Sequence, residues 1–282
     1  MSSTHVTSRP ATRLEGTLRP AIRLMANLGF TQKFLLVSAL LLLPLAIVLV
    51  MFGADVEREL AFTRSELLGT DLLRSVRGFD QTLHEAIVLQ RRDAAGDPSA
   101  HPALVRSAAK LDDRLRQLNA KFEARGAALG LEAQVRAVSA NWVYLHDRID
   151  SGDPERVASL FRDLSGEVRD LSTEIGNRSS LVLDPDLDSY YLMDVVVNRL
   201  PEAQRHTTQL AIDHGANARR SADADMRERT RLYRTLLATN TDELRRSYAT
   251  AIGNTRSTHL GIALQDVVQE CISARAELDA HL

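Results

Sequence analysis

The first clear feature of the chain is an uncharged apolar run, FLLVSALLLLPLAIVLVMFG, from Phe34 to Gly53. A helix of about 20 apolar residues matches the hydrocarbon core of a bilayer, and Pro44 is tolerable within such a helix. We therefore predict a transmembrane helix over residues 34–53. A cleaved signal peptide is the alternative, although its apolar core would be shorter and no small-residue cleavage site follows Phe52.

The charges on either side of this run predict its orientation. Residues 1–33 contain a single acidic residue, Glu15, and several basic ones: Arg9, Arg13, Arg19, Arg23 and Lys33. Acidic residues follow the run, at Asp55, Glu57 and Glu59. By the positive-inside rule, we expect residues 1–33 to be cytoplasmic and residues 54–282 to lie outside, which means the periplasm if the membrane is a bacterial inner membrane.

Beyond the membrane segment, apolar residues recur at alternating spacings of four and three, which is typical of helices packed in a bundle or coiled coil. Four segments show this seam before residue 183. Asp153 and Pro154 supply an N-cap and a first helical residue for the fourth. The seams are Leu72, Val76, Phe79, Leu83 and Ile87; Leu104, Ala108, Leu111, Leu115, Leu118 and Phe122; Leu131, Val135, Val138, Trp142, Leu145 and Ile149; and Val157, Phe161, Leu164, Val168, Leu171 and Ile175.

Three further helical segments follow a polar break. The first covers about residues 188–216 and is interrupted by Pro201, and residues 214–223 are expected to form a turn. The seam of the second also includes two polar residues, Thr230 and Asn240. The apolar seam residues of the second and third segments are Met226, Tyr233, Leu237, Leu244 and Ala251, then Leu260, Leu264, Val267, Cys271 and Leu278. The fold class is therefore all-α.

The break itself lies in the stretch NRSSLVLDPDLDSYYLMD, residues 177–194. Pro185 disfavours helix for the residue before it, so the arriving helix should end or kink near Leu183 or Asp184. A new helix can start at once, with Asp186, Asp188 or Ser189 as its cap. We predict a structural junction made by Asp184, Pro185, Asp186, Asp188, Tyr190 and Tyr191. A calcium loop would need Gly and Glu where Ser189 and Val195 stand.

The direction of the chain after the break decides the architecture. If the break only bends the chain, two four-helix bundles stack end to end and the last helix returns towards the membrane. The distal bundle would then cover about residues 75–183, and the membrane-proximal bundle about residues 54–75 plus 186–282. We adopt this arrangement as the working prediction, and a single long bundle is the competing one.

The segment LVLDPDLDSYYLMD resembles one in the extracytoplasmic sensor regions of bacterial transmembrane receptors, and LQRRDAAGD (residues 89–97) resembles a polar segment of the same group. Such regions are helical ligand-binding domains. The resemblance implies an input module for a methyl-accepting chemotaxis protein, a histidine kinase or a diguanylate cyclase, of which we favour the first. Heptad seams in such a layout also favour a homodimer.

Composition narrows the range of functions. The formal net charge of −2 gives no general nucleic-acid footprint. A single cysteine, Cys271, excludes an intrachain disulfide and any multi-cysteine metal site. None of the common catalytic or nucleotide-binding motifs is present. His206 and His214 are expected to be solvated rather than to bind a metal. We therefore predict a protein that is not an enzyme and that has neither cofactor nor metal.

Three arginines are the candidate ligand-binding residues: Arg91, Arg92 and Arg178. Guanidinium groups suit small organic acids or oxyanions bound between helices. The sequence thus favours an extracytoplasmic sensor that signals by a shift between two helix arrangements. The alternative is a membrane-anchored helical scaffold without a small ligand.

Overall fold

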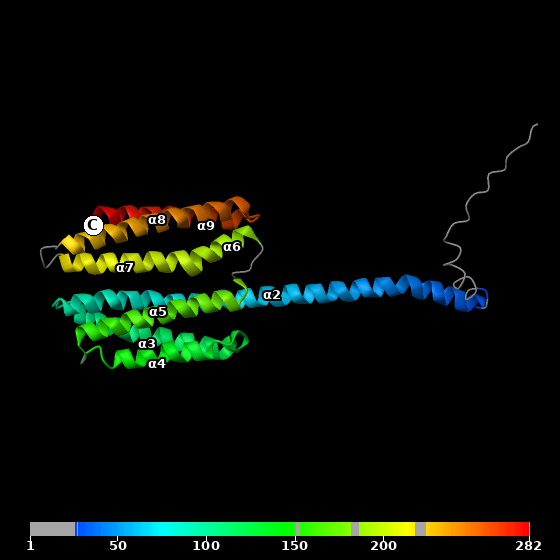
Figure 1. Ribbon diagram of the computed structural model, residues 1–282, viewed down its shortest axis with the longest axis horizontal. Coiled ribbons are helices and arrows are strands. Elements are labelled where there is room, and N and C mark those ends of the chain that lie inside the picture. The colour runs from blue at the N-terminus through cyan, green and yellow to red at the C-terminus, as the bar shows by residue number, and fades with distance from the viewer. Residues whose placement is uncertain (1–25, 27, 151–152, 182–185, 218–223, 282) are drawn as a thin grey trace, which may run out of the picture. The chain divides into compact units, whose positions relative to one another are not determined.

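The computed structural model describes residues 26, 28–150, 153–181, 186–217 and 224–281, and within these ranges every regular element is helical (Figure 1). The all-α prediction is therefore confirmed. The chain divides into two compact units, residues 1–61 and 62–282, and each is described by itself. The junction residues Asp184 and Pro185 lie outside the described residues.

The first unit contains the N-terminal part of helix α2 (Phe30–Ala94). Pro44 lies inside this helix without ending it. Nearly all side chains from residue 30 to residue 61 are exposed; Leu40, for example, is 70% exposed. In the part of the chain that the structure describes, α2 is the one helix long and apolar enough to cross a membrane. This composition and exposure are consistent with membrane association.

The second unit begins with a four-helix bundle. It consists of α2 from residue 62 onward, α3 (Ala100–Arg125), α4 (Glu132–His146) and α5 (Pro154–Arg178), with a short 3-10 turn, η1 (Gly126–Leu129), before α4. The predicted heptad seams form its core, and Leu72, Phe79, Leu111 and Phe161 are completely buried. The regular four–three spacing places one apolar stripe on each helix, which explains why these four helices pack together.

The bundle ends where α5 meets α2. Helix α5 stops at Arg178, earlier than the expected end near Leu183, and Ser180 adopts a left-handed backbone conformation with φ of 64°. Ser179 is completely buried and packs against Gly69 of α2. A side chain at position 69 would overlap Ser179 Oγ. Among the described residues, this close approach accompanies the end of α5.

After the break come α6 (Leu187–Asp194), a π-helical turn η3 (Val195–Arg199), α7 (Leu200–Asn217), α8 (Ala224–Asn254) and α9 (Thr258–His281). A second, smaller core lies among them. Its buried residues are Val195, Leu244, Tyr248, Ala251 and Leu264. Two other residues of the same stretch, Met193 and Val197, pack into the core of the first bundle instead.

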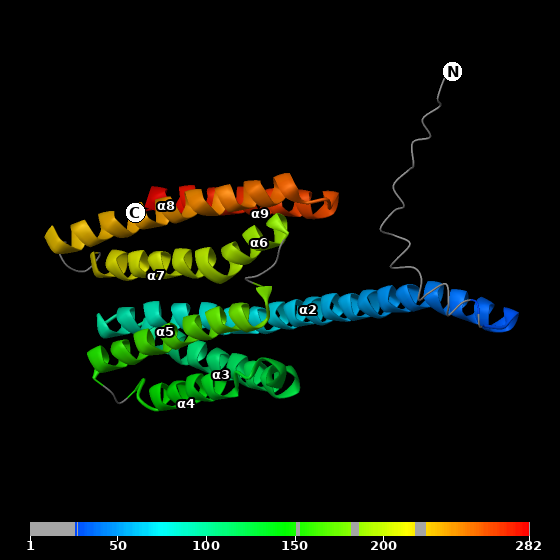
Figure 2. The ribbon, with the colours of Figure 1, turned by 45° about the vertical axis from the view of Figure 1, so that its right-hand side comes forward.

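The two groups of helices lie side by side. Helix α5 runs towards the break, and α6, η3 and α7 return alongside it, as both views show (Figures 1 and 2). This differs from the expected end-to-end stack with a dividing line near residue 75. The physical reason is burial: by turning back, the chain packs Met193, Val197 and Ile212 against the first bundle. A chain that merely bent would leave these side chains in water.

Candidate functional site

The most unusual packing in the second unit lies between α6–η3–α7 and α8, which run antiparallel (Figure 1). Polar and charged side chains from both sides occupy much of this contact. We call it the polar seam and define it by Asp194, Arg199, Glu202, His206 and Asp213 on one side and Thr230, Tyr233, Asn240 and Glu243 on the other.

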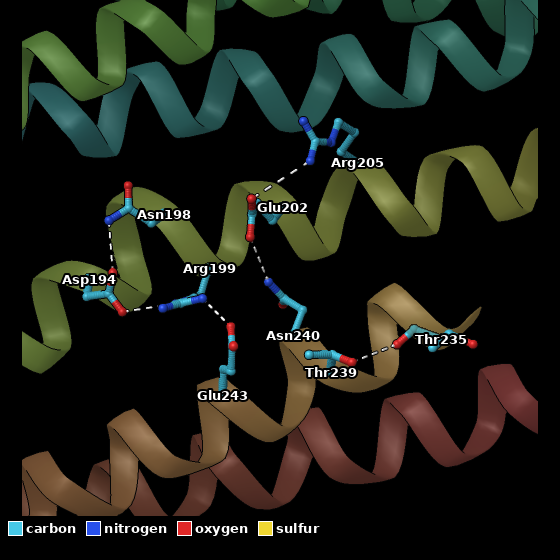
Figure 3. A network of polar contacts seen from close by, with 9 residues as sticks. All are labelled: Asp194, Asn198, Arg199, Glu202, Arg205, Thr235, Thr239, Asn240 and Glu243. Atoms are coloured by element: carbon cyan, nitrogen blue, oxygen red, sulfur yellow. Dashed lines mark hydrogen bonds and ion pairs between the residues drawn. The ribbon is translucent and has the colours of Figure 1, made fainter. Parts of the chain in front are cut away.

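The π-helical turn η3 positions the first part of the seam. The Leu200 amide donates to Val195 O, five residues back, instead of four. Pro201 follows directly; it has no amide hydrogen to donate to Val197 O, and its ring crowds that carbonyl. The wider turn lets Val195 enter the second core while Val197 enters the first. Asp194 and Arg199 are thereby directed towards α8 (Figure 3). π-Helical turns occur frequently at functional sites.

A chain of charged contacts connects η3 to α8 (Figure 3). Asp194 Oδ1 accepts from Asn198 Nδ2 at 2.9 Å, and Asp194 Oδ2 accepts from Arg199 Nε at 3.0 Å. Arg199 Nη1 then donates to Glu243 Oε2 on α8. These contacts, above all the hydrogen bond that Arg199 donates to Asp194, raise the pKa of Arg199. One guanidinium group thus neutralises two partly buried carboxylates on different helices.

One turn further along α7, Glu202 makes the next connection (Figure 3). Its Oε2 accepts from Asn240 Nδ2 of α8 at 3.3 Å, and its Oε1 lies 3.8 Å from Arg205 Nη2. On α8 itself, Thr239 Oγ1 donates to Thr235 O at 3.1 Å. Between α7 and α8, the seam is therefore held here by the hydrogen bond from Asn240 to Glu202.

The far part of the seam contains buried polar atoms without hydrogen-bond partners. They are His206 Nδ1, Asp213 Oδ2, Thr230 Oγ1 and Asn240 Oδ1. His206, Asp213 and Asn240 are 6%, 3% and 4% exposed, respectively. The His206 ring lies beside the Tyr233 ring, with 5.9 Å between centroids. Buried polar groups are normally paired, and each unpaired one costs about 1–3 kcal/mol. Each of these atoms is therefore a place where a bound water or a ligand would supply the absent hydrogen bond.

The electrostatics of this part follow from burial. Burial raises the pKa of Asp213, although the hydrogen bond from Gln209 and the charge of Arg229 oppose the shift. Burial and the nearby charge of Arg205 lower the pKa of His206, and Glu202 opposes them. Both shifts favour the neutral form, which for His206 leaves one ring nitrogen able to accept a hydrogen bond.

A second buried polar pair lies where α2 faces α7. His84 Nδ1 is 3.0 Å from Asp80 O and 3.3 Å from Asp80 Oδ1, and both residues are less than a tenth exposed. Gln204 Nε2 of α7 donates to the same Asp80 carbonyl at 3.4 Å. This pair connects the first bundle with the helix that carries the polar seam.

The structure does not bring the three candidate arginines together. Arg91 Nη1 donates to Glu155 Oε1 at 2.8 Å, and Arg92 binds Asp97 Oδ2 through two nitrogens. Arg178 is the last residue of α5, and its Nη1 donates to Leu129 O and Gly130 O and supports the turn before α4. Each of the three makes contacts that position a loop or helix end, and a ligand role for them stays a prediction.

The described junction residues begin α6. Asp186 occupies the N-cap position of α6, where no side-chain cap hydrogen bond forms, and the Tyr190 amide donates to the backbone oxygen of Asp186 at 2.9 Å. Asp188 Oδ1 accepts from the Ser189 amide at 2.9 Å. The rings of Tyr190 and Tyr191 meet edge to face with 5.4 Å between centroids. Tyr191 packs against the second core, whereas Tyr190 is 42% exposed, so only one of the two tyrosines is packed as expected.

Several residues of the seam went unrecognised in the sequence. His206 was expected to be solvated, and the structure corrects this: it is buried, whereas His214 is exposed. The signal was present, because Ala203, His206, Leu210 and Asp213 continue the four–three spacing along α7. Across the described ranges, no group of three or more His, Cys, Asp or Glu residues could hold a metal ion.

Comparison with known proteins adds no identity. No family model, curated protein or solved structure matches this chain. The resemblance of the LVLDPDLDSYYLMD segment to receptor sensor regions therefore remains a prediction, and functional inference depends on the sequence pattern and the polar seam.

Proposed function

We propose that this chain is the extracytoplasmic sensory input module of a bacterial transmembrane receptor, of the chemotaxis type in the first instance. Residues 34–53 cross the inner membrane, residues 1–33 lie in the cytoplasm and residues 54–282 lie in the periplasm. The module works as a homodimer and transmits ligand binding, through helix movement, to a cytoplasmic output module.

The polar seam is the observation that carries this proposal. In the first bundle, facing helices interlock through apolar side chains such as Phe79 and Leu111. In the seam, Arg199, Glu202 and Asn240 hold α7 and α8 through polar contacts. Apolar interdigitation resists sliding because every shift opens voids. Polar contacts exchange partners at smaller cost, which suits the small helix displacements of signalling proteins.

The buried Asp80–His84 pair supports the same function. It lies at the contact between α2 and α7, where Gln204 shares the Asp80 carbonyl. Helix α2 is also the helix that contains the predicted membrane span. A movement of α7 relative to α8 therefore has a polar route to the helix that would carry it to the membrane.

Topology is tested by thiol labelling of the full chain in whole cells. Cys271 is first replaced by Ser, and Thr173→Cys is introduced on the exposed surface of α5. A membrane-impermeant maleimide should label this position in intact spheroplasts, whereas Ser8→Cys in the predicted cytoplasmic segment should react only after lysis. Labelling of position 173 only after lysis would refute the periplasmic placement.

Helix movement is tested by spin-label distance measurements on the full chain, with Cys271→Ser. Labels introduced by Thr207→Cys on α7 and Arg231→Cys on α8, both at exposed positions, report the seam. If the chain is a sensor, we expect two populations of the distance between the two labels, and Arg199→Gln should change their ratio because it weakens the seam. A single population that this substitution does not change would favour the scaffold alternative.

A further inference from the structure

The far part of the polar seam has the chemistry of a ligand site. Asp213 Oδ2 and His206 Nδ1 on α7, and Thr230 Oγ1 on α8, are buried atoms without partners. A carboxylate oxygen is an acceptor, the Nδ1 of a neutral imidazole accepts when Nε2 holds the hydrogen, and a hydroxyl oxygen can accept as well. Their natural complement is therefore a molecule with hydrogen-bond donors, and the carboxylate favours a positive charge.

The spacing of these atoms indicates the shape of the ligand. His206 and Asp213 are seven residues apart on α7, about two helical turns or 10 Å. Leu210, completely buried, lies between them on the same face. Because α7 and α8 are antiparallel and His206 lies beside Tyr233, Thr230 is placed at a level between His206 and Asp213. The site thus has a polar group at each end and an apolar residue in the middle.

From this arrangement we infer that the seam binds a short aliphatic diamine. One ammonium group binds Asp213 Oδ2 and Thr230 Oγ1, the alkyl chain packs on Leu210, and the second amino group donates to His206 Nδ1. An ammonium group supplies three donors, enough for Asp213 and Thr230 together. This inference rests on the proposed sensory function, since it names the ligand whose binding would separate or shift α7 and α8.

The existing charges of the seam agree with such a ligand. Asp213 Oδ1 already accepts from Gln209 Nε2 at 3.1 Å, so one oxygen fixes the carboxylate and the other remains for the ligand. The nearest guanidinium groups are tied elsewhere: Arg229 pairs with Asp225 at 2.9 Å, and Arg205 lies 3.8 Å from Glu202. Arg229 acts on Asp213 only through its charge, so Asp213 Oδ2 is left without a directly hydrogen-bonded cation.

The test is calorimetric titration of the full chain in detergent micelles with putrescine, a four-carbon diamine. Two probes of the same carbon length are compared with it: 1,4-butanediol, which lacks the charge, and succinate, which has the opposite charge. We expect putrescine to bind with a Kd below about 1 mM, and the two other probes to bind at least tenfold more weakly.

Three variants locate the site. Asp213→Asn keeps the oxygen that binds Gln209 but removes the charge, and should weaken putrescine binding at least tenfold. Thr230→Val, which removes only a hydroxyl, should weaken it severalfold. Asp242→Asn, an exposed carboxylate on the same helix α8, is the matched control and should leave binding unchanged. Melting curves without ligand verify folding, and if Asp213→Asn does not fold, Thr230→Val decides.

The inference is overturned if putrescine does not bind with a Kd below about 1 mM, if succinate binds as well, or if the folded Asp213 and Thr230 variants bind like the control. These outcomes are independent of the topology experiment. Periplasmic labelling of residue 173 without diamine binding leaves the sensory proposal intact and refutes this ligand. Diamine binding with cytoplasmic labelling refutes the sensory proposal and leaves the site.

Discussion

Gly69 shows how a single missing side chain permits the first bundle to close. A methyl group at this position would overlap Ser179 Oγ and come within 2.9 Å of Leu181 Cδ1. Ser179 is completely buried at the end of α5, so it has no open space to move into. Gly in the middle of a helix is otherwise unfavourable by about 1 kcal/mol relative to Ala. The packing of α5 against α2 therefore explains why a Gly is present.

Gly69→Ala should destabilise the fold by about 1–3 kcal/mol, because overpacking forces α5 away from α2. The measurement is urea unfolding of the full chain in detergent. Gly166→Ala, within α5, is the matched control, since its nearest neighbour is Arg169 Nη2 at 4.0 Å. This control should be stabilising by up to about 1 kcal/mol. Equal effects of the two substitutions would contradict the packing explanation.

The buried Asp80–His84 pair makes stability depend on pH. Burial by itself lowers the pKa of His84, but the hydrogen bonds and charge of Asp80 together outweigh it, so the pKa is raised. A histidine whose folded-state pKa is raised stabilises the fold fully below its unfolded pKa, about 6.5. That stabilisation is lost as the pH rises through the folded-state pKa.

Asp80→Asn should therefore cost more stability at about pH 5.5 than at about pH 8.5. At the lower pH His84 is protonated and loses its charged partner, whereas at the higher pH His84 is neutral and no ion pair is lost. The comparison is the free energy of unfolding of variant and wild type at the two pH values. Asp113→Asn, on an exposed carboxylate of α3, should show no such pH dependence. A loss that is the same at both pH values would argue against the pairing.

The π-helical turn η3 explains how one short stretch of chain contributes residues to two cores. Its wide turn sends Val195 to the second core and Val197 to the first, while Arg199 faces α8. Pro201 is visible in the sequence as an interruption of the helix. The sequence alone does not reveal whether such an interruption produces a kink, an end or a π-helical turn, because that outcome depends on what packs on each side.

Arg199 tests the mechanical role of this element. Arg199→Gln leaves Asp194 and Glu243 partly buried without their shared cation, so we expect a loss of about 1–3 kcal/mol in the free energy of unfolding. The control is Arg245→Gln on the same helix as Glu243, where Arg245 and Asp242 form an exposed pair at 3.9 Å. Such surface pairs contribute about 0–1 kcal/mol. A loss in the free energy of unfolding no larger than that of the control would show that the contacts of Arg199 with Asp194 and Glu243 stabilise the fold no more than an exposed surface pair.

The positions of the helices could be predicted from the sequence better than their arrangement in space. The heptad seams of α2–α5 are local patterns, and almost every seam residue named from them is buried. The direction of the chain after residue 186 is a non-local property: it depends on Met193 and Val197 finding space in the first core. Spacing within one helix carries no information about that space.

The candidate site was only half visible for a related reason. In the heptad pattern of the α8 segment, Thr230 and Asn240 are polar residues at positions that are otherwise apolar. In the structure Asn240 is buried and Thr230 is half-buried. Asp213 and His206 follow the same spacing on α7, but their facing partners come from a helix that only the fold identifies. The arginines predicted to bind a ligand contact nearby carboxylates and carbonyl groups, and they do not lie together.

The two helix groups should also differ in dynamics, because their contacts differ. The first bundle buries large apolar side chains on all four helices, whereas α7 and α8 meet through the polar seam with unpaired buried atoms. Local opening costs less where fewer apolar contacts are lost. In hydrogen exchange measured by mass spectrometry on the full chain, amides of α3 and α5 should exchange more slowly than amides in the seam-facing parts of α7 and α8.

The Arg199→Gln variant supplies the internal comparison for this experiment. Removing the cation should speed exchange in α8 around Glu243 and in η3, and leave α3 unchanged, because α3 has no part in the seam. Arg245→Gln should change neither region. Uniform protection across both groups, or faster exchange in α3 than in α8, would show that the seam is as rigid as the apolar bundle. A rigid seam could not carry a signal by sliding, so the sensory proposal would lose its mechanism.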